Sequence, residues 1–411
     1  MKVAVVYQYY QGHGSPGHSL VYELSQYLAE RGHDVTVVSG ETGYMKHDAL
    51  VLPWYRRIVR RELDGAVKVV RTFTYSELNR TYLGRILNFI SFSISCPIGL
   101  LAIEKPDVVL ASSPPIFPMF SAWLICKLRR IPFVFEVRDL WPASAIQMGI
   151  LKNRLLIGIM TWMEKVLYNE SRKIVALTNG IREDICNRGW PRERVALVTC
   201  GVDFDKLYPD SAGAAVVRGK HGWNDKKIVM YFGAMGEANN MPVILRAAGR
   251  LRERDDVLFV LIGDGMKRVA TEQLKITMGL ENVVILPPVP KDEARIFIGA
   301  ADLCLVTLRD IPLFDGAIPT KLVDYMACGK PVLCGIRGEA KQIVDESGAG
   351  LTFEPDDDQQ MSALIVQLLE DGDRAARMGS SGLAYVRDRF AASTMWLGME
   401  EVLLEAVNAR H

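Results

Sequence analysis

The sequence lacks the features that mark several functional classes. Its seven cysteines form no Cys-x-x-Cys pair and mostly fall in apolar runs, so we expect reduced core residues and neither a disulfide framework nor a zinc site. The six histidines show no metal-ligand spacing, and no Asp-x-Asp pair suited to a divalent cation stands at the end of a predicted strand. We therefore expect a protein that uses neither a metal ion nor a cofactor.

Charge of one sign and long apolar runs are also missing. The 49 basic and 48 acidic residues nearly cancel, which argues against nucleic acid as a partner. Residues 1–205 nevertheless hold 25 basic and 19 acidic side chains, so one basic face is expected there. No long apolar segment follows Met1 and Lys2, so we predict no secretion signal and expect a cytoplasmic protein.

Strand-length apolar runs alternate with helical patterns through nearly the whole chain. This alternation predicts an α/β protein with parallel sheets built from β-α-β units. Because 411 residues exceed the usual size of one hydrophobic core, we expect two doubly wound domains. The predicted strands are residues 3–7, 35–39, 67–72, 108–111, 133–137, 174–177 and 195–198 in the first half, and 228–232, 258–262, 283–286, 303–307, 331–334 and 350–353 in the second.

The boundary between the domains is expected in a weakly patterned stretch at residues 205–225, which contains Pro209 and three glycines. We therefore assign residues 1–205 to a first domain and 206–390 to a second. Residues 391–411 contain an amphipathic segment that follows a complete second domain. We expect this terminal helix to pack back on the first domain.

The stretch at residues 318–333 predicts a loop, a helix and a buried strand. Thr320 suits the helix N-cap, and Gly329 suits a left-handed C-cap before Pro331 ends the helix. The free N–H groups and positive dipole end of a helix start bind anions, and Lys321 adds a formal charge beside them. Asp324 lies one turn later and is a candidate partner for a neutral diol. The stretch therefore predicts a phosphate site.

Two glycine turns follow predicted strands of the second half. Their backbone N–H groups can approach an anion closely, although tight strand-to-helix turns also use glycine for steric reasons. Together with the stretch at 318–333, they put three candidate anion contacts at the same edge of one sheet. The turn residues are Gly233 and Gly236 after the first strand, and Gly263, Gly265, Lys267 and Arg268 after the second.

Pro288 and Val289 follow the next predicted strand. Their backbone is a candidate contact for a nucleobase, and a plain proline-rich turn explains them equally well.

The first loop contains Gly12, Gly14 and Gly17, which match the Gly-x-Gly-x-x-Gly fingerprint of dinucleotide-binding proteins. That fingerprint has its first glycine directly at the strand end, whereas here residues 8–11 intervene. We therefore favour a glycine loop that faces the interdomain cleft, with Gly14, Gly17 and His18 on the acceptor side. A plain connecting turn is the alternative.

Three charged residues, Glu136, Arg138 and Asp139, stand at the carboxyl end of the strand at 133–137. An ion pair between Arg138 and one of the two carboxylates would be purely structural. The functional interpretation is binding of an acceptor, with Asp139 as a positioning group or a base.

Arg56, Arg57, Arg60 and Arg61 fall on one stripe of a predicted helix. Residues 83–103 are largely apolar but are interrupted by polar side chains and Pro97, so they are too broken for a membrane-spanning helix. Basic and aromatic residues near an apolar segment favour an interfacial contact with anionic lipid, on the inner face of the membrane. A solvated charged face and a buried helix are the alternatives.

Several of these segments together resemble the retaining glycosyltransferases of family 4, which have the GT-B fold of two Rossmann-like domains with an interdomain cleft. The resemblance runs nearly end to end and is greatest to the branch containing the bacterial N-acetylfucosamine transferases of surface polysaccharide synthesis. It rests on the segments R-G-H-D-V-T-V-V-S-G, K-P-D-V-V-L-A-S-S-P-P, F-E-V-R-D-L-W-P, G-V-D at 201–203 and P-T-K-L-V-D-Y-M-A-C-G-K-P-V.

The resemblance implies a nucleotide-sugar donor, with a UDP-sugar preferred, held by the second domain. It also implies a lipid-linked or other glycan acceptor held by the first domain, and no metal. Asp324 matches the second Glu of the family's Glu-x7-Glu motif, which binds the donor ribose. The first Glu of that motif falls on Gly316, so its contact with the donor sugar is lost or passes to Asp315.

The resemblance also shows where this chain departs from the family. The Arg and Lys that many members use on the diphosphate fall on Ala234 and Asn239, which have no charge. Arg138 stands where many members carry His. The remaining candidates for the phosphate charge are Lys321, Lys267 and Arg268, together with the helix start at Thr320.

The implied mechanism is stabilisation of a departing nucleoside diphosphate, without an enzyme nucleophile or a glycosidase-like pair of carboxylates. A nucleotide-sugar 2-epimerase of the same fold is one rival, although that activity usually needs several carboxylates and a His around the sugar. A non-catalytic, membrane-associated sugar-nucleotide-binding protein is another, which the glycine at position 316 would favour.

Overall fold

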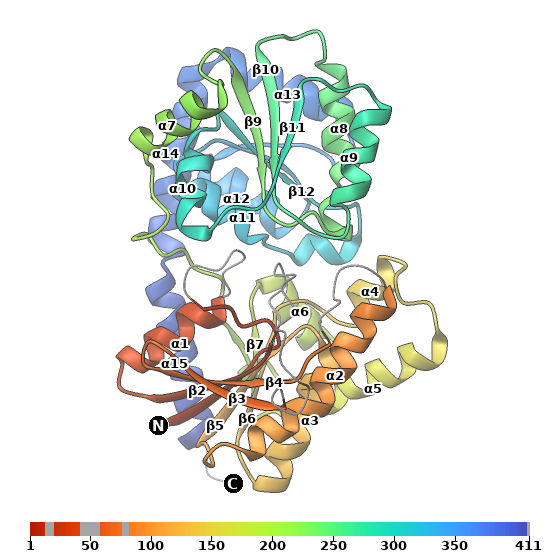
Figure 1. Cartoon of the computed structure of the whole chain (residues 1–411), viewed down its shortest axis with the longest axis vertical. Coiled ribbons are helices and arrows are strands. Elements are labelled where there is room, and N and C mark those ends of the chain that lie inside the picture. Colours follow the sequence, from red (N-terminus) through yellow and green to blue (C-terminus); the bar gives the residue numbers. More distant parts are fainter. Residues whose placement is uncertain (13–19, 42–57, 76–81, 409–411) are drawn as a thin grey trace. The chain divides into compact units, whose positions relative to one another are not determined.

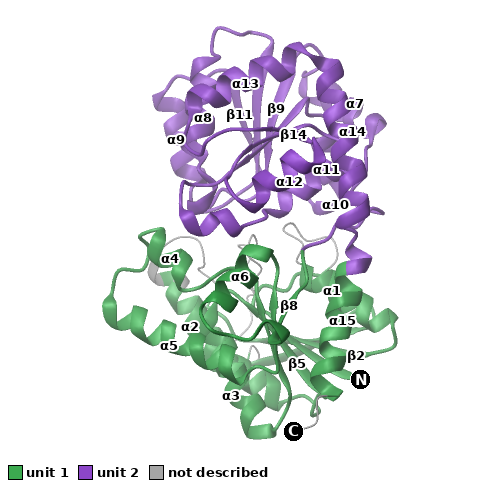
Figure 2. Cartoon of the chain, turned by 180° about the vertical axis from the view of Figure 1, so that it is seen from behind, with its two compact units in different colours: residues 1–199, 395–411 green, residues 200–394 purple. Residues whose placement is uncertain are grey.

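The computed structural model describes residues 1–12, 20–41, 58–75 and 82–408. The chain forms two compact units, of which unit 1 is Met1–Thr199 with Met395–His411 and unit 2 is Cys200–Thr394 (Figure 2). Each unit is a β-sheet covered by helices on both faces (Figure 1). The α/β class with two doubly wound domains is confirmed.

The sheet of unit 1 contains eight strands, seven of them in parallel register. Its strands are β1 (Lys2–Val6), β2 (Asp34–Gly40), β3 (Val59–Asp64), β4 (Val67–Thr72), β5 (Val108–Ser113), β6 (Phe133–Val137), β7 (Lys173–Ala176) and β8 (Val195–Leu197). The order across the sheet is β3-β4-β2-β1-β5-β6-β7-β8, so the strand order reverses between β1 and β5. All seven strands predicted for this half are present.

Strand β3 was not predicted, and it replaces the expected basic helix. Arg60 and Arg61 lie on β3, which pairs antiparallel with β4 through a turn at Gly65. Arg60 forms an ion pair with Glu62 at 3.1 Å, and Arg61 donates to the carbonyl of Ala102 at 2.7 Å. The prediction of one helical stripe is therefore wrong for these two residues. Hydrogen bonding of β3 to β4 at the edge of the sheet stabilises a strand here, despite the helical spacing of the sequence.

Helices cover both faces of the unit 1 sheet. Side chains of α1 and α15 pack in one core with alternate residues of β1, including Val3 and Val5. Helices α2, α3 and α5 pack against β4, β5 and β6 respectively, and Gly99 of α2 lies against Val38 and Val70, which belong to the opposite face. The helices of this unit are α1 (Leu20–Glu30), α2 (Tyr82–Leu101), α3 (Ile116–Arg129), α4 (Ala143–Gln147), α5 (Arg154–Glu170), α6 (Asn179–Asn187), the short η2 (Arg192–Arg194) and α15 (Ala392–Asn408).

Helix α15 is attached to unit 1 by polar contacts as well as by its apolar face. The buried carboxylate of Glu400 accepts hydrogen bonds from Tyr27 and Arg31, both at 3.3 Å, and lies 2.8 Å from Nε2 of His33. Burial alone would raise the pKa of Glu400, but the hydrogen bonds and positive charges of His33 and Arg31 have the larger combined effect and lower it. None of the helices in the described part of the chain is long and apolar enough to cross a lipid bilayer.

The sheet of unit 2 contains six parallel strands. They are β9 (Lys227–Phe232), β10 (Val257–Ile262), β11 (Val283–Leu286), β12 (Leu303–Thr307), β13 (Val332–Gly335) and β14 (Gly350–Thr352). Their order is β11-β10-β9-β12-β13-β14, so the direction of winding reverses between β9 and β12. The six strands predicted for this half are all present.

The helices of unit 2 include one that the sequence pattern did not predict. Helix α7 forms inside the stretch at 205–225, where Asp210 caps its start by accepting from the Gly213 N–H at 2.8 Å and Gly222 ends it with a positive φ of 68°. The helices are α7 (Ser211–His221), η3 (Glu237–Asn239), α8 (Met241–Arg250), α9 (Arg268–Thr277), α10 (Lys291–Gly299), η4 (Pro312–Gly316), α11 (Thr320–Ala327), α12 (Glu339–Ser347), α13 (Asp358–Glu370) and α14 (Gly372–Arg389).

Candidate functional site

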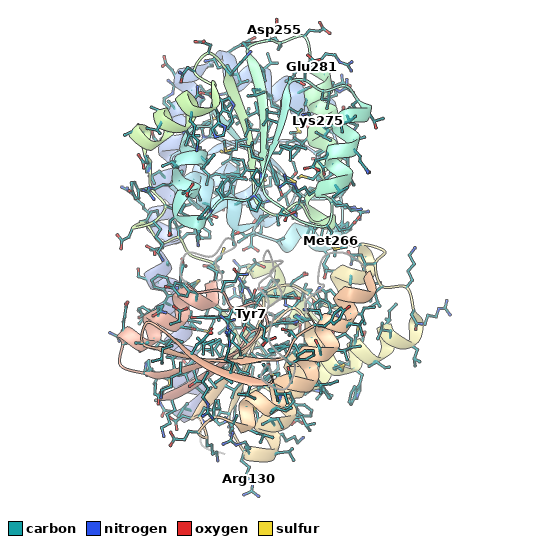
Figure 3. All side chains as sticks on the ribbon, in the orientation of Figure 1. Tyr7, Arg130, Asp255, Met266, Lys275 and Glu281 are labelled. Carbon is teal, nitrogen blue, oxygen red and sulfur yellow. The ribbon has the colours of Figure 1, made fainter. Side chains whose placement is uncertain are left out.

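The residues predicted to bind a donor gather at the carboxyl edge of the unit 2 sheet. This edge carries the turns that follow β9, β10 and β12, and open α/β sheets bind ligands where the winding reverses between such strands. In Figure 3, Met266 of the turn after β10 lies at this end of the unit, whereas Asp255 and Glu281, which precede β10 and β11, lie at the opposite end.

Helix α11 begins at this edge, and its start differs slightly from the prediction. Pro319 is the N-cap, Thr320 is already helical, and the structure gives no side-chain capping bond there, so the prediction of Thr320 as the cap is wrong by one residue. Gly329 has the expected positive φ of 67°. Tyr325 fixes the helix to β9, because its hydroxyl accepts from the Phe232 N–H at 2.7 Å and donates to the Phe232 carbonyl at 3.0 Å.

The side chain of Lys321 extends from the first turn of α11 to the end of β9. Its Nζ donates hydrogen bonds to the Tyr231 hydroxyl and, at 3.1 Å, to Oδ1 of Asn239. The same nitrogen lies 4.0 Å from the centroid of the Tyr231 ring, close enough for cation–π attraction. The chain also covers Gly233, since a Cβ added there would lie 3.4 Å from Cε of Lys321.

Burial controls the charge of this lysine. Desolvation lowers the pKa of Lys321 from 10.5 to about 7, and the carboxylate of Asp324 opposes that shift. The ammonium is therefore only partly populated near neutral pH. A phosphate placed beside it would supply the missing negative charge and favour the protonated form.

The backbone N–H groups of the glycine turns form hydrogen bonds within unit 2. The N–H of Gly233 donates to the Ile262 carbonyl at 2.9 Å, and that of Gly263 donates to the Leu286 carbonyl at 3.2 Å. The N–H of Gly265 donates to Oδ1 of the preceding Asp264 at 2.8 Å. These three N–H groups therefore do not contribute to an anion site, because each is already bonded within the protein. The assignment of the two turns to the donor site stays a prediction.

Steric demand, the alternative interpretation, accounts for the glycines. A Cβ on Gly263 would lie only 1.9 Å from the carbonyl oxygen of Gly233, and one on Gly265 would lie 2.5 Å from the carbonyl oxygen of Met235. Both glycines also have a φ of 150°, a value that residues with a Cβ rarely adopt. Gly236 is the N-cap of the short helix η3 in the same loop.

A carboxylate that sequence reasoning missed organises the cations of this edge. Glu237 forms ion pairs with Lys267 at 2.7 Å and with Arg309 at 3.2 Å. The three side chains border a hollow of about 230 Å³, together with Gly236, Asn240, Met241, Pro242, Ala270, Thr271 and Leu274. A Glu beside a glycine turn at the end of a strand was the available signal, and the family comparison did not point to it.

Arg268 supports the turns. It donates to the Gly263 carbonyl at 2.7 Å and pairs with Glu272 at 2.9 Å. Thus Lys267 and Arg268, predicted as phosphate cations, both hold protein carboxylates in this structure.

The remaining donor-side candidates lie on neighbouring turns of unit 2. Pro288 and Val289 follow β11, directly beside the turn after β10. Asp315 and Gly316 end the short helix η4 just before α11, and the Asp315 side chain is exposed. Gly338 packs tightly on this segment, since a Cβ added to it would lie 2.0 Å from the Asp315 carbonyl oxygen.

The acceptor-side candidates of the first domain lie at the carboxyl end of β6. Glu136 is buried, and one oxygen of its carboxylate has no hydrogen-bond partner among the described residues. The guanidinium of Arg138 lies 5.6 Å from the ring centroid of Tyr7, which follows β1. Asp139 accepts a hydrogen bond from the Ser144 hydroxyl at 3.0 Å, and burial raises the pKa of its carboxyl group despite that bond.

Some predicted residues lie outside the described part of the chain. These are Gly14, Gly17 and His18 of the first loop and Arg56 and Arg57 of the basic segment.

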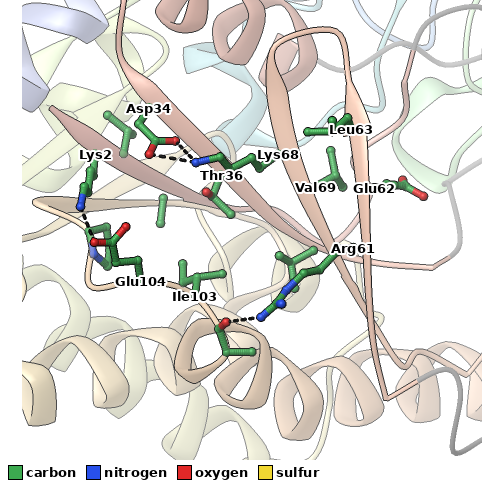
Figure 4. Close-up of a pocket in the computed structure, with 15 residues that line it drawn as sticks. Lys2, Asp34, Thr36, Arg61, Glu62, Leu63, Lys68, Val69, Ile103 and Glu104 are labelled. Atoms are coloured by element: carbon green, nitrogen blue, oxygen red, sulfur yellow. Dashed lines mark hydrogen bonds and ion pairs between the residues drawn. The ribbon is translucent and has the colours of Figure 1, made fainter.

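A larger pocket of about 550 Å³ lies at the opposite, amino-terminal edge of the unit 1 sheet (Figure 4). Its charged lining residues already have partners. Lys2 pairs with Glu104 at 2.6 Å and Lys68 pairs with Asp34 at 2.7 Å, while Arg61 donates to the carbonyl of Ala102. This pocket lies where the strands of the unit 1 sheet begin, at the edge opposite to the turns that follow their carboxyl ends.

The carboxyl edge of unit 2 suits a ligand with both phosphate and hydroxyl groups. It combines the ammonium of Lys321 with the first N–H groups of α11, which an α-helix leaves without intrahelical partners. The carboxylate of Asp324 is one turn away on the same helix. In the portion of the chain that the structure describes, no cluster of three or more His, Cys, Asp or Glu residues suits a metal ion.

Two protein-family models match the chain in succession. The model described as Glycosyltransferase Family 4 matches residues 18–206. The model described as Glycosyl transferases group 1 matches residues 215–384.

Curated relatives align with much or all of the chain. The putative colanic acid biosynthesis glycosyl transferase WcaI of Escherichia coli strain K12 is 23% identical over 314 residues, which cover 75% of this chain and 76% of that protein. The D-inositol 3-phosphate glycosyltransferase of Thermobispora bispora is 28% identical over 431 aligned residues, which cover 97% of this chain and 92% of that protein.

Solved structures share the fold along its whole length. Sucrose-phosphate synthase from Thermosynechococcus elongatus matches with a TM-score of 0.78 at 17% identity, covering 100% of both chains. Anabaena Alr3699/HepE, solved with UDP and glucose, matches with a TM-score of 0.72 at 17% identity, covering 98% of this chain and 99% of that one. The two family models together match residues 18–206 and 215–384, so the chain belongs to the family 4, group 1 glycosyltransferases, and the solved structures show that it has the GT-B fold.

Proposed function

We propose that this protein is a retaining, metal-independent glycosyltransferase that moves a sugar from a UDP-sugar to a lipid-linked glycan in polysaccharide synthesis. The observation that carries the donor half is the Lys321 ammonium, held by Tyr231 and Asn239 at the start of α11. A UDP donor is favoured because the Anabaena protein of the same fold was solved with UDP and glucose. A polysaccharide role is favoured because the Escherichia coli relative is named for colanic acid biosynthesis.

The mechanism follows from the charge that develops when the sugar leaves. Cleavage of the bond between the sugar and the diphosphate puts negative charge on the leaving phosphate. Lys321 and the first N–H groups of α11 would stabilise that charge, and one good donor in such a site lowers a barrier by about 3 kcal/mol. Asp324 would accept hydrogen bonds from the ribose hydroxyls and so set the position of the nucleotide.

The acceptor would be bound by the carboxyl end of β6 in the first domain. The unpartnered oxygen of Glu136 is suited to a sugar hydroxyl of the acceptor, because a buried carboxylate oxygen without a partner is costly. Arg138 would bind an anionic group of the acceptor. Asp139, whose pKa is raised by burial, would orient the attacking hydroxyl or accept its proton.

The choice of donor sugar would rest on Asp315, since Gly316 has no side chain. Asp315 lies at the surface just before α11, and partial desolvation raises the pKa of its carboxyl group. Relation to the N-acetylfucosamine transferase branch, a cytoplasmic location and attachment to the inner face of the membrane belong to the same proposal.

A donor panel tests this function. The purified protein is incubated with UDP-, GDP- and dTDP-sugars and a lipid extract, and the products are separated into lipid-linked and free sugar. We expect transfer of one sugar to lipid from a UDP donor, with retention of anomeric configuration. Epimerised free sugar would instead identify a 2-epimerase, and nucleotide binding without any product would identify a non-catalytic binding protein.

Lys321→Ala and Lys275→Ala form a matched pair for this assay. Lys275 lies in the last turn of α9, and Figure 3 shows it away from the carboxyl edge. Loss of transfer in the first variant alone would link the activity to α11, whereas equal activity in both would remove Lys321 from the site.

A further inference from the structure

Three neighbouring helices of unit 1 expose apolar side chains on their outer surfaces. Helix α2 exposes a stripe at helical spacing, α3 exposes two leucines one turn apart, and α5 exposes a third stripe. The exposed residues of this outer face are Leu87, Ile90, Ile94, Ile98 and Leu101 on α2, Leu124 and Leu128 on α3, and Leu155, Ile159 and Trp162 on α5.

The three stripes belong to one surface. Helices α2 and α3 pack closely against each other, and α3 packs against α5. The ring centroids of Phe120 on α3 and Trp162 on α5 are 5.3 Å apart, and that of Trp123 is 5.0 Å from Phe120, so aromatic rings join the second and third stripes. All three helices cover the same face of the sheet, and their exposed sides point away from it. We call this surface the α2–α3–α5 face.

Ordinary exposure does not account for this face. Single exposed apolar residues are normal on proteins, but a contiguous patch marks a protein or membrane contact. Residues 86–103 contain no charged side chain, so α2 from Ile86 to its end at Leu101 presents only uncharged side chains to solvent. Ile94 is 67% exposed, Leu128 is 72% exposed and Leu155 is 74% exposed, one on each helix.

The charged residues around this face indicate which kind of partner it binds. On α3, α5 and their adjoining residues the exposed cations are Lys127, Arg130, Lys152, Arg154 and Lys165, and the exposed anion is Glu170, which pairs with Lys127 at 2.9 Å. The end of α2 adds the exposed Lys105 and the exposed anions Glu104 and Asp107, so cations still outnumber anions around the face. A cationic rim around an apolar surface complements a bilayer that contains anionic lipid. A second copy of this chain would bring a rim of the same sign and would be repelled.

We infer that the α2–α3–α5 face binds the surface of a membrane containing anionic lipid, through an apolar centre and a cationic rim. This inference deepens the proposed function, because it names the surface that would hold the enzyme beside a lipid-linked acceptor. It also moves the membrane contact away from the arginine segment at 56–61, part of which is strand β3.

The test is vesicle binding by a centre variant with a matched control. The centre variant carries Ile94→Ser, Leu128→Ser and Leu155→Ser. The control carries Leu63→Ser, Val216→Ser and Ile276→Ser, which remove equally exposed apolar residues from β3, α7 and α9, with exposures of 74%, 69% and 77%. Both are co-sedimented with vesicles of neutral lipid containing about 30% phosphatidylglycerol, an anionic lipid.

We expect the centre variant to lose at least tenfold in vesicle partition coefficient and the control to stay within twofold of the parent. A rim variant, Lys152→Glu with Arg154→Glu, should bind anionic vesicles more weakly than the parent, and its binding should depend less on salt concentration. Equal binding by the parent and the centre variant, or equal loss in the control, would overturn the inference.

UDP affinity, measured by calorimetry without lipid, separates this inference from the proposed function. The centre variant should bind UDP as the parent does. If the parent binds vesicles through this face but transfers no sugar, the proposed glycosyltransferase function is rejected and the membrane-binding inference is still supported. If light scattering shows a parent dimer that the centre variant breaks while vesicle binding is unchanged, the face is a contact between copies and the membrane inference fails.

Discussion

The ammonium of Lys321 lies over the ring of Tyr231 and donates a hydrogen bond to the hydroxyl of the same residue. This double contact orients a cation that is partly neutral near physiological pH, because burial lowers the pKa of Lys321 to about 7. A ligand that brings negative charge to this point would complete the charge balance.

Removing the lysine should trade activity for stability. Lys321→Met keeps the apolar stem but removes a desolvated cation, so we expect UDP binding and turnover to fall at least tenfold while the melting temperature rises. Because the folded-state pKa lies below the unfolded value of 10.5, the stability of the parent rises with pH from about 7 to 10.5. The gain from Lys321→Met should therefore be largest at about pH 7 and below. A lower melting temperature there would contradict this account.

Donor affinity should depend on pH with a definite sign. Only protonated Lys321 attracts a diphosphate, so UDP should bind most tightly below pH 7 and more weakly as the pH rises through the pKa of about 7. Binding near neutral pH should also take up protons, which calorimetry in buffers of different ionisation enthalpy measures directly. Lys321→Met should show no such uptake in this pH range. The UDP phosphate has its own pKa, so methylene-linked UDP analogues serve as a second ligand.

Substitution of Asn239 should shift the pH dependence of UDP binding. Asn239 accepts from Lys321 at 3.1 Å, and Asn239→Asp would place a carboxylate there and favour the charged ammonium. We expect the midpoint of the pH dependence to move up by about one unit or more, with weaker UDP binding at low pH because the carboxylate repels phosphate. Asn239→Ala controls for loss of the amide. If the pH midpoint of UDP binding is the same in both variants, the pH dependence does not arise from the titration of Lys321.

The second glycine turn should not tolerate a side chain. Gly263→Ala would put a Cβ 1.9 Å from the Gly233 carbonyl oxygen at a φ of 150°, so we expect unit 2 to lose more than about 2 kcal/mol of unfolding free energy. Gly219→Ala is the matched control, because it lies in α7 with nothing within 4 Å of its added Cβ. Denaturant unfolding of both variants measures the difference. Equal free energies of unfolding for the two variants would mean that the turn shifts to accommodate the added Cβ without cost.

The carboxylate of Glu400 should support stability in mild acid. Its pKa is lowered by donors from His33 and Arg31, so its contribution is complete above about pH 4.5 and is lost as the pH falls through the folded-state pKa. Glu400→Gln should reduce the melting temperature at neutral pH and flatten its fall between about pH 5 and 3. Glu401→Gln, on the exposed side of the same helix, should leave both unchanged. Identical acid profiles for the two variants would refute this role.

Much of the fold was predictable because its signals are local. Buried parallel strands are short continuous apolar runs, and each predicted run forms a strand within a residue or two of its expected ends. Strand β3 was not predicted because its two apolar residues, Val59 and Leu63, lie four residues apart, as on one face of a helix, and its pairing with β4 depends on tertiary structure.

The site was predictable only in part. Lys321 and Asp324 could be proposed from the sequence because both lie on one short helix. Tyr231 was missed as a partner, since it reads as an ordinary core residue of β9. Glu237 was missed because its ion pairs join segments that are far apart in sequence, and no local pattern records them.

The return of α15 to unit 1 has a consequence for dividing the protein into separate parts. Unit 2 is one continuous segment, Cys200–Thr394, inserted between the two parts of unit 1. All six strands of its sheet lie within that segment, so unit 2 can be cut out in one piece. Residues 1–199 alone lack Met399, Leu403 and the Glu400 carboxylate, which cover their sheet. Unit 2 should therefore fold as an isolated segment, whereas unit 1 should fold only with residues 395–408 joined to it.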